Sequence, residues 1–214
     1  MDDGWLRSRA TDLWEEASAI TDTPVEQYLL NRAIGQFSPA LRFHPRTPLG
    51  PRRQIVFRPA MLAAVQEGSR VIAVQRTFLD TVLARRARDL GNPRRMLGRP
   101  ARAAVMLADA TDVLGLAEGI ETALSAMILL GIPVWAALGN ERLSRIAIPS
   151  SVDRLILLLD NDRPGRRAEV IAREAHTKPG RTIDTFWPWH GLNDWNDVLR
   201  REGERGGGRR RQVA

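Results

Sequence analysis

The sequence contains no cysteine, one lysine and one tyrosine among its 214 residues. The lack of cysteine excludes disulfides and thiolate-ligated zinc, and three scattered histidines do not supply a structural zinc finger in their place. No stretch of about 18 apolar residues is present to predict a membrane span. The N-terminal residues Met-Asp-Asp-Gly-Trp are acidic and lack the apolar core of a secretory signal. These absences predict a cytoplasmic protein that does not enter membranes.

Positive charge is abundant and consists almost entirely of arginine, since Lys178 is the only lysine and the formal net charge is +7. Between Arg46 and Arg102 the sequence has thirteen arginines but only three carboxylates. A block of this kind indicates a surface that binds phosphates. A basic face that contacts only water remains the alternative for the same block.

The first half of the chain mixes helical and strand patterns, which predicts an α+β fold. The expected elements are helices within residues 5–34, with a helix start at Thr23-Pro24, a proline-rich loop with a short strand at 41–44, strands at 54–59 and 70–79, and a mobile basic loop over 84–102. The two longer strands would form an antiparallel pair. The loop that joins them would hold Met61 to Val65.

From residue 113 onward, strand and helix patterns alternate, which predicts a parallel sheet with helices on both faces. The expected strands are 114–117, 133–138, 155–159 and 182–187, and the expected helices are 121–130, 166–176 and 194–201. The segment from Trp187 to His190 either lines a metal-binding edge of this sheet or packs the last strand against the closing helix, and packing is favoured. The tail from Gly203 to Ala214 is rich in glycine and arginine, which predicts disorder.

Five carboxylates follow strands of this predicted sheet. Glu118 follows the first strand, Asp160 and Asp162 follow the third, and Asp194 and Asp197 follow the fourth. The carboxyl ends of parallel strands lie at one edge of a sheet, where ligands bind in open α/β folds. Neighbouring carboxylates repel each other unless a cation such as Mg²⁺ lies between them, and Mg²⁺ is held by one or two carboxylates and substrate phosphates. The alternative for Asp162 is a simple helix cap.

Three segments carry a resemblance to the Toprim domain, the catalytic fold of bacterial-type primases, topoisomerases and some nucleases. Glu118 to Leu124 resembles its first motif, Leu159 to Gly165 its Asp-x-Asp motif, and Asn193 to Leu199 the closing acidic motif of primase-type members. Upstream, residues 55–59, 72–76 and 92–97 are similar to the segment that precedes Toprim in phage- and plasmid-type primases. The resemblance implies a basic α+β subdomain at 1–112, a Toprim domain at 113–202 and a tail at 203–214.

For function, the resemblance implies a divalent-metal-dependent nucleotidyltransferase that synthesises RNA primers during DNA replication. Asp160 and Asp162, with Asp194 or Asp197, would hold Mg²⁺ or Mn²⁺, and Glu118 would be the general base or a further metal ligand. The residues implied to contact template and nucleotide are Arg76, Arg94 and Arg95. The implied ligands are single-stranded DNA and nucleoside triphosphates, and the implied partners are a replicative helicase or other replication proteins of mobile elements.

The sequence departs from the primase pattern in two ways. The zinc-binding and helicase modules that accompany such primases are not in these 214 residues, and Asn196 stands where bacterial primases tend to have a second aspartate. Two other functions therefore stay open: a metal-dependent nuclease that uses the same acidic edge, and a non-catalytic protein that binds single-stranded DNA. Topoisomerase chemistry is disfavoured because the only tyrosine, Tyr28, lies in a predicted scaffold helix.

Overall fold

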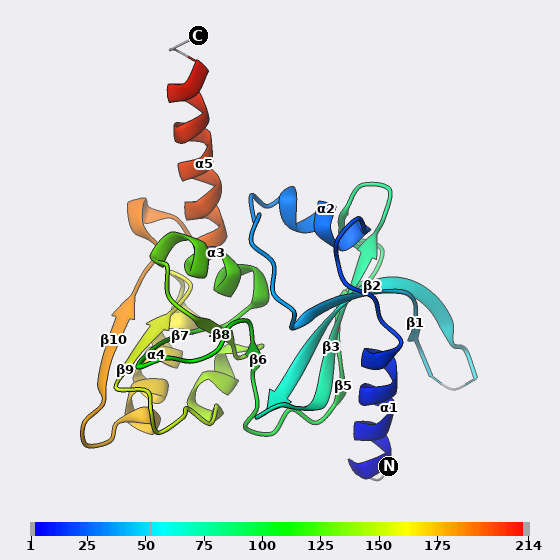
Figure 1. Cartoon of the computed structure of the whole chain (residues 1–214), viewed down its shortest axis with the longest axis horizontal. Helices are drawn as coiled ribbons and strands as arrows, with labels where there is room; N and C mark the ends of the chain where they lie inside the picture. The colour runs from blue at the N-terminus through cyan, green and yellow to red at the C-terminus, as the bar shows by residue number, and fades with distance from the viewer. Residues whose placement is uncertain (1–2, 52, 212–214) are drawn as a thin grey trace. The chain divides into compact units, whose positions relative to one another are not determined.

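A computed structural model describes residues 3–51 and 53–211, and the chain divides into two compact units (Figure 1). The N-terminal unit comprises Met1–Asn31 and Ser38–Val105, and the C-terminal unit comprises Arg32–Phe37 and Met106–Ala214. The boundary that the sequence places before residue 113 remains a proposal. No sequence pattern indicated that Arg32–Phe37 belongs with the second half of the chain. Within the described ranges, no helix has the length and apolar composition that crossing a membrane requires.

The N-terminal unit is an antiparallel sheet with two helices, as an α+β fold predicts. Its elements are α1 (Asp3–Glu15), α2 (Pro24–Leu30), β1 (Leu41–Leu49), β2 (Val56–Glu67), β3 (Arg70–Asp80), β4 (Arg85–Arg86) and β5 (Arg94–Gly98). The strand order is β1-β2-β3-β4, and β5 also pairs with β3. The hydroxyl of Thr23 accepts a hydrogen bond from the Val25 amide, so Thr23-Pro24 starts α2 as predicted. Apolar residues of α1, such as Leu13, pack against Leu62, Val74 and Phe78 of the sheet.

The strands of this unit are longer than the sequence patterns predict. Among the strands of the described residues β1 pairs with β2 alone, and its other edge carries a single bridge from Phe43 to Ser18, so the strand can contain two prolines. Its register shifts between His44 and Thr47, around Pro45, where a missing N–H costs no ladder bond. The expected loop from Met61 to Val65 is wrong: these residues lie in the middle of β2 and are fully buried. A strand covered on both faces has no alternating polar positions to reveal it.

The expected mobile loop over 84–102 is also wrong in part. β4 and β5 within it pair with β3, so several of its arginines belong to the sheet.

The C-terminal unit is built on a parallel sheet in the order β10-β9-β7-β8-β6, which confirms the predicted α/β architecture. Its elements are β6 (Val105–Met106), β7 (Val113–Ala117), α3 (Ile120–Leu130), β8 (Val134–Ala136), η1 (Asn140–Arg145), β9 (Arg154–Leu158), α4 (Arg163–His176), β10 (Thr182–Phe186), η2 (Trp189–Gly191) and α5 (Trp195–Arg211). The chain moves from β7 to β8 in one direction along the sheet and from β9 to β10 in the other. Right-handed crossovers therefore place α3 and α4 on opposite faces.

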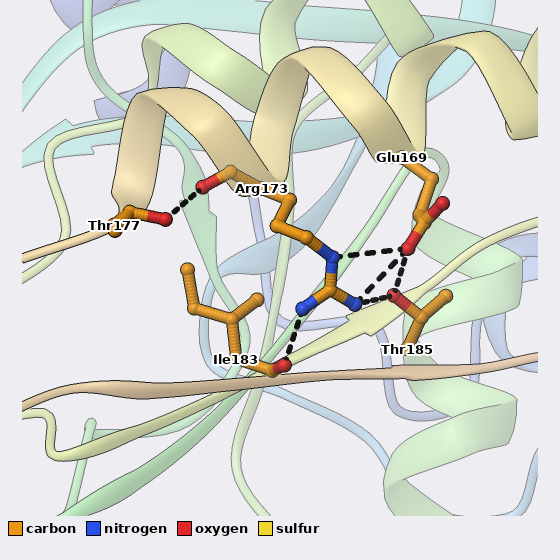
Figure 2. A network of polar contacts seen from close by, with 5 residues as sticks. All are labelled: Glu169, Arg173, Thr177, Ile183 and Thr185. Atoms are coloured by element: carbon orange, nitrogen blue, oxygen red, sulfur yellow. Dashed lines mark hydrogen bonds and ion pairs between the residues drawn. The ribbon is translucent and has the colours of Figure 1, made fainter.

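A polar network attaches α4 to the edge strand β10 (Figure 2). The Arg173 guanidinium donates to the carbonyl oxygen of Ile183 at 2.6 Å, to the hydroxyl of Thr185 at 2.7 Å and to the carboxylate of Glu169 at 3.0 Å. Thr185 also donates to Glu169 at 2.8 Å. The hydrogen bonds to Glu169 from Thr185 and from Arg173 lower the pKa of this carboxyl group. The network fixes α4, and with it the turn that precedes α4, relative to the sheet.

α5 continues to Arg211, through most of the segment for which composition predicts disorder. Arginine has a high helix propensity, so the helix that begins at Trp195 can extend through these residues despite the glycines. Residues 212–214 of the predicted disordered tail lie outside the described part of the chain.

Candidate active site

The strand register brings two of the three acidic segments to one edge of the C-terminal sheet. β7 and β9 are parallel neighbours with Ala117 opposite Leu158, so Glu118 follows β7 beside the residue that precedes Asp160. β8 and β10 end at the same level, since Ala136 pairs with Ala117 and Phe186 pairs with Leu158. The register therefore puts Glu118 and Asp160 at the carboxyl edge of two adjacent central strands.

The backbone of the turn after β9 is closely packed, which explains why the turn has an aspartate at position 162 and a glycine at position 165. The carboxylate of Asp162 accepts a hydrogen bond from the Gly165 amide at 2.6 Å and caps α4. A β-carbon on Gly165 would lie only 2.2 Å from the carbonyl oxygen of Asp160, so no larger residue fits there. Asp160 and Asp162 are both partly buried. Asp162 therefore caps α4 with one carboxylate oxygen, and its other oxygen takes no part in the cap.

Asn161, between the two aspartates, connects this turn to the closing acidic segment. Its amide N–H donates to the carbonyl oxygen of Asn193 at 2.7 Å, so the residue before Asp194 lies beside the Asp-x-Asp turn. The side-chain oxygen of Asn161 accepts from Arg166 at 3.0 Å, and the Arg166 guanidinium lies 4.9 Å from the ring centre of Trp187. Sequence reasoning did not single out Asn161 or Arg166. The position of Asn161 inside an acidic motif was the only local signal.

The closing segment begins α5. A carboxylate oxygen of Asp194 accepts a hydrogen bond from the Asp197 amide at 2.8 Å, so Asp194 caps this helix and Asp197 lies in its first turn. Trp189 packs edge-on against the fully buried Trp195, with ring centres 5.2 Å apart. Trp189 therefore packs against the closing helix, while Trp187 lies beside Arg166 near the acidic edge.

The side chain of Asn196 is held by hydrogen bonds to residues of two other segments. It is buried, and its side-chain nitrogen donates to the carbonyl oxygen of Arg32 at 2.8 Å and to the hydroxyl of Ser125 at 3.0 Å. Its side-chain oxygen accepts from the guanidinium of Arg32 at 3.0 Å. The side chain at position 196 donates hydrogen bonds, which an asparagine can do and an ionised aspartate cannot.

The loop after β8 is strained beside Glu118. The backbone carbonyl of Glu118 accepts from the amides of Leu138 at 2.7 Å and Gly139 at 3.2 Å. Leu138 has a φ of 69°, which is unusual for a leucine, and Gly139 has a φ of 144°. Strain of this kind concentrates at functional sites, where surrounding structure holds it.

The five candidate carboxylates follow strands at this edge, but they do not form a preassembled cluster. Among the residues that the structure describes, no group of three acidic or histidine side chains is close enough to hold one metal ion. Two of the carboxylates, those of Asp162 and Asp194, each direct one oxygen to a helix N-terminus. The residues present fit an ion such as Mg²⁺, which takes one or two carboxylates and completes its shell with substrate phosphates and water.

The predicted arginines of the N-terminal unit lie on β3 and β5. Arg76 is directly opposite Arg95, so their side chains share one face of the sheet, and alternation along β5 puts Arg94 on the other face with Thr77. Arg76 donates to the carbonyl oxygens of Pro48 at 2.8 Å and Met96 at 3.4 Å.

The positive charge of Arg76 is energetically unfavourable in its surroundings. Burial lowers the pKa of the Arg76 guanidinium, and the neighbouring charge of Arg95 lowers it further. Its buried Nε makes no hydrogen bond to any residue in the described ranges. Neither Arg76 nor Arg95 forms an ion pair with a carboxylate of the residues that the structure describes, and two such neighbouring cations favour the binding of an anion at this face.

Comparisons with known proteins agree with this architecture. Residues 113–205 match the family described as Toprim domain, and residues 5–107 match a family described as a domain of unknown function (DUF7146). No curated protein matches the sequence.

Solved structures with this fold include three primases. A DNA primase domain from Pseudomonas aeruginosa is 15% identical, with a TM-score of 0.64 over 92% of this chain and 75% of that chain. A primase catalytic domain bound to single-stranded DNA is 18% identical, with a TM-score of 0.65 over 98% and 78%. The primase fragment of the bacteriophage T7 primase-helicase protein is 15% identical, with a TM-score of 0.53 over 69% and 60%. At these identities the likeness concerns the fold alone.

Proposed function

We propose, since the chain carries a Toprim domain and has the fold of primase catalytic cores, that it is a primase-like nucleotidyltransferase that synthesises short RNA primers on single-stranded DNA. The observation that carries the proposal is the register of β7 and β9, which puts Glu118 and the Asp-x-Asp turn at one sheet edge. The hydrogen bond from Asn161 to Asn193 adds the closing acidic segment to that edge.

In this proposal Asp160 and Asp162 hold Mg²⁺ or Mn²⁺ together with Asp194 or Asp197. The bound ion would neutralise charge on the triphosphate and on the departing pyrophosphate. Glu118 accepts the proton of the attacking 3′-hydroxyl, or serves as a further ligand. Asn161 and Arg166 position the turn, since Arg166 holds the Asn161 side chain and Asn161 holds the closing segment.

Arg76 and Arg95 serve as the phosphate-binding pair of the N-terminal unit. Their adjacent charges are mutually unfavourable until an anion binds between or beside them. Arginine suits this role because its planar guanidinium presents several donors to phosphate oxygens. The ligands would be nucleoside triphosphates and single-stranded DNA, and a primase catalytic domain with this fold has been solved bound to single-stranded DNA. A replicative helicase is a proposed partner, by likeness to the T7 primase-helicase protein.

One observation favours a second function, a non-catalytic protein that binds single-stranded DNA. The described residues contain no group of three metal-binding side chains, and Asp162 and Asp194 both cap helices. In that case the acidic residues would have a structural role, and the basic face of β3 and β5 would carry the function.

Primer synthesis tests the proposal. Purified protein is incubated with single-stranded DNA, ribonucleotides and Mg²⁺ or Mn²⁺, with and without a replicative helicase, and labelled products are separated by length. We expect short RNA products from the wild type and none from Asp160→Asn. Cleavage of labelled DNA without nucleotides, again lost in Asp160→Asn, would identify a nuclease instead. DNA binding that Asp160→Asn leaves intact, with neither product, would establish the binding protein and overturn the polymerase.

A further inference from the structure

The end of β1 and the beginning of β2 form a two-stranded arm that extends away from the rest of the N-terminal unit (Figure 1). The arm consists of the described residues 46–51 and 53–58. Leu49 pairs with Val56 within the arm, whereas β2 pairs with β3 only from Ala60 onward. A two-stranded ribbon without a third strand beside it is marginally stable in water. The arm therefore needs contacts with the rest of its unit to hold its position.

Two arginines supply those contacts at the base of the arm. Arg58 donates to both carboxylate oxygens of Asp89, at 2.5 and 3.1 Å. Arg76 of β3 donates to the carbonyl oxygen of Pro48 at 2.8 Å. A surface that is positioned before its partner arrives loses less conformational freedom on binding.

Three consecutive apolar side chains of the arm are exposed to solvent. The exposed fraction is 43% for Ile55, 54% for Val56 and 55% for Phe57. Val56 and Phe57 are neighbours in a strand and point to opposite faces, so both faces of the arm present apolar surface. Single exposed apolar residues are normal on a protein, whereas a group of them marks an interaction surface.

The charged residues of the arm are all arginines. Residues 27–66 contain six arginines and no carboxylate. Arg46 and Arg53 are exposed, and neither forms an ion pair with a carboxylate of the residues that the structure describes. A second copy of the same arm would be repelled by this charge, and an acidic partner would be attracted to it.

The apolar composition of the arm favours a protein partner over a nucleic acid. Single-stranded nucleic acids stack their bases on aromatic side chains. Phe57 is the only aromatic residue of the arm, and the Arg46 guanidinium already lies over its ring, 5.2 Å from the ring centre. Ile55 and Val56 offer aliphatic surface, which is removed from water most readily by apolar side chains of another protein.

We propose that the arm docks a disordered acidic segment of another protein, in which carboxylates alternate with apolar residues. The apolar side chains of the segment pack on Ile55, Val56 and Phe57. Its carboxylates bind the guanidinium groups of Arg46 and Arg53. A disordered segment suits a projecting ribbon because it can fold around both faces as it binds. The inference goes beyond primer synthesis and does not depend on it.

Selection from a library of random peptides tests the proposal without assuming the sequence of the partner. The full chain is the bait, and the double variant Val56→Ser, Phe57→Ser is used for counter-selection. Both replaced side chains are more than half exposed, so this variant should unfold at the same urea concentration as the wild type. We expect the recovered peptides to be enriched in acidic residues together with large apolar ones. Recovered peptides without that enrichment, or no peptide that prefers the wild type, would overturn the proposal.

Anisotropy titrations of the tightest labelled peptide separate the two kinds of contact. We expect Phe57→Ser to raise the Kd at least about tenfold and Arg53→Gln at least about threefold. Two matched controls should leave the Kd within about twofold. Val170→Ser removes an exposed apolar side chain of α4, and Arg145→Gln removes an exposed arginine of η1. Equal effects of arm and control variants would mean that the peptide binds without a defined site, and the proposal would fail.

Single-stranded DNA is the rival ligand of the arm. We expect Phe57→Ser to leave the Kd for a labelled oligonucleotide within about twofold of the wild type. DNA binding that falls with Phe57→Ser as much as peptide binding does would assign the arm to nucleic acid and overturn the proposal. Asp160→Asn should bind the peptide as the wild type does, so a failure of the catalytic proposal remains distinguishable from a failure of this one.

Discussion

The side-chain nitrogen of Asn196 lies 2.8 Å from the carbonyl oxygen of Arg32, a residue 164 positions earlier in the chain. The same nitrogen donates to Ser125 on α3, so one buried amide joins the start of α5 to α3 and to the segment Arg32–Phe37. An aspartate has no donor for either bond. The asparagine at this position is therefore explained by packing of the closing helix.

Asn196→Asp should destabilise the protein. The substitution removes both donated hydrogen bonds and buries a carboxylate, and the nearby Arg32 guanidinium offsets only part of that cost. We expect a loss of about 1–3 kcal/mol in the free energy of unfolding, measured by urea denaturation. Asn193→Asp is the control, because the Asn193 side chain is exposed. Equal stability of the two variants would contradict the assigned role of Asn196.

Gly165→Ala should distort the Asp-x-Asp turn. The added β-carbon would lie 2.2 Å from the carbonyl oxygen of Asp160, and backbone must move to relieve that contact. We expect a loss of about 1–3 kcal/mol in stability together with lost primer synthesis. Gly203→Ala is the matched control in α5, where an added methyl group meets nothing within 4 Å and alanine favours the helix. An unaffected Gly165→Ala variant would show that the turn adjusts freely.

Substitutions at Asp162 can separate its capping role from its proposed metal role. Asparagine is as good a helix cap as aspartate, whereas alanine cannot cap. Asp162→Ala should lose about 1 kcal/mol of stability, and Asp162→Asn should stay within a few tenths of the wild type. Both should lose primer synthesis if the charge holds the metal. Full activity of Asp162→Asn would leave Asp162 with the capping role alone.

The alternation of strands and helices after residue 113 could be predicted from the sequence, because each buried strand is a short apolar run followed by a turn. That pattern predicts that Glu118 and Asp160 follow parallel strands at one edge of the sheet. The register of β7 and β9, which sets the level of the two strand ends, comes from the structure. The metal and phosphate roles of the candidate residues stay predictions. Asn161 and Asn196 could not have been assigned, since their partners are distant in sequence and an amide has no local pattern.

The N-terminal unit was harder to predict for two physical reasons. The central part of β2 is buried on both faces and rich in alanine, so it has neither alternation nor a β-branched composition. β1 contains prolines that normally argue against a strand, and it tolerates them as an edge strand with a register shift. Its bulge is closed by a bond from the Arg46 amide to the ring of His44, a contact that no sequence pattern indicates.

Glu169→Gln should reduce the loss of stability in acid. The pKa of Glu169 is lowered in the folded protein by hydrogen bonds from Thr185 and Arg173 (Figure 2). A carboxyl group with a lowered folded pKa contributes stability above its unfolded pKa, and that contribution is lost as the pH falls through the folded value. Urea denaturation from pH 7 down to about pH 3 should therefore show a steeper decline for the wild type than for Glu169→Gln. Glu174→Gln, an exposed change on the same helix, should follow the wild type.

Arg95→Ala should weaken binding of single-stranded DNA more than Arg94→Ala does. Arg95 shares a face with Arg76, whereas Arg94 lies on the opposite face of the same strand, so the two variants remove equal charge from different surfaces. The binding constant for single-stranded DNA falls with salt concentration, and each lost phosphate contact makes the logarithmic plot of that dependence less steep by about 0.7. Titrations at several salt concentrations should show that change for Arg95→Ala and a smaller one for Arg94→Ala. Equal slopes would mean that the basic block attracts DNA by net charge, without a defined phosphate site at Arg76 and Arg95.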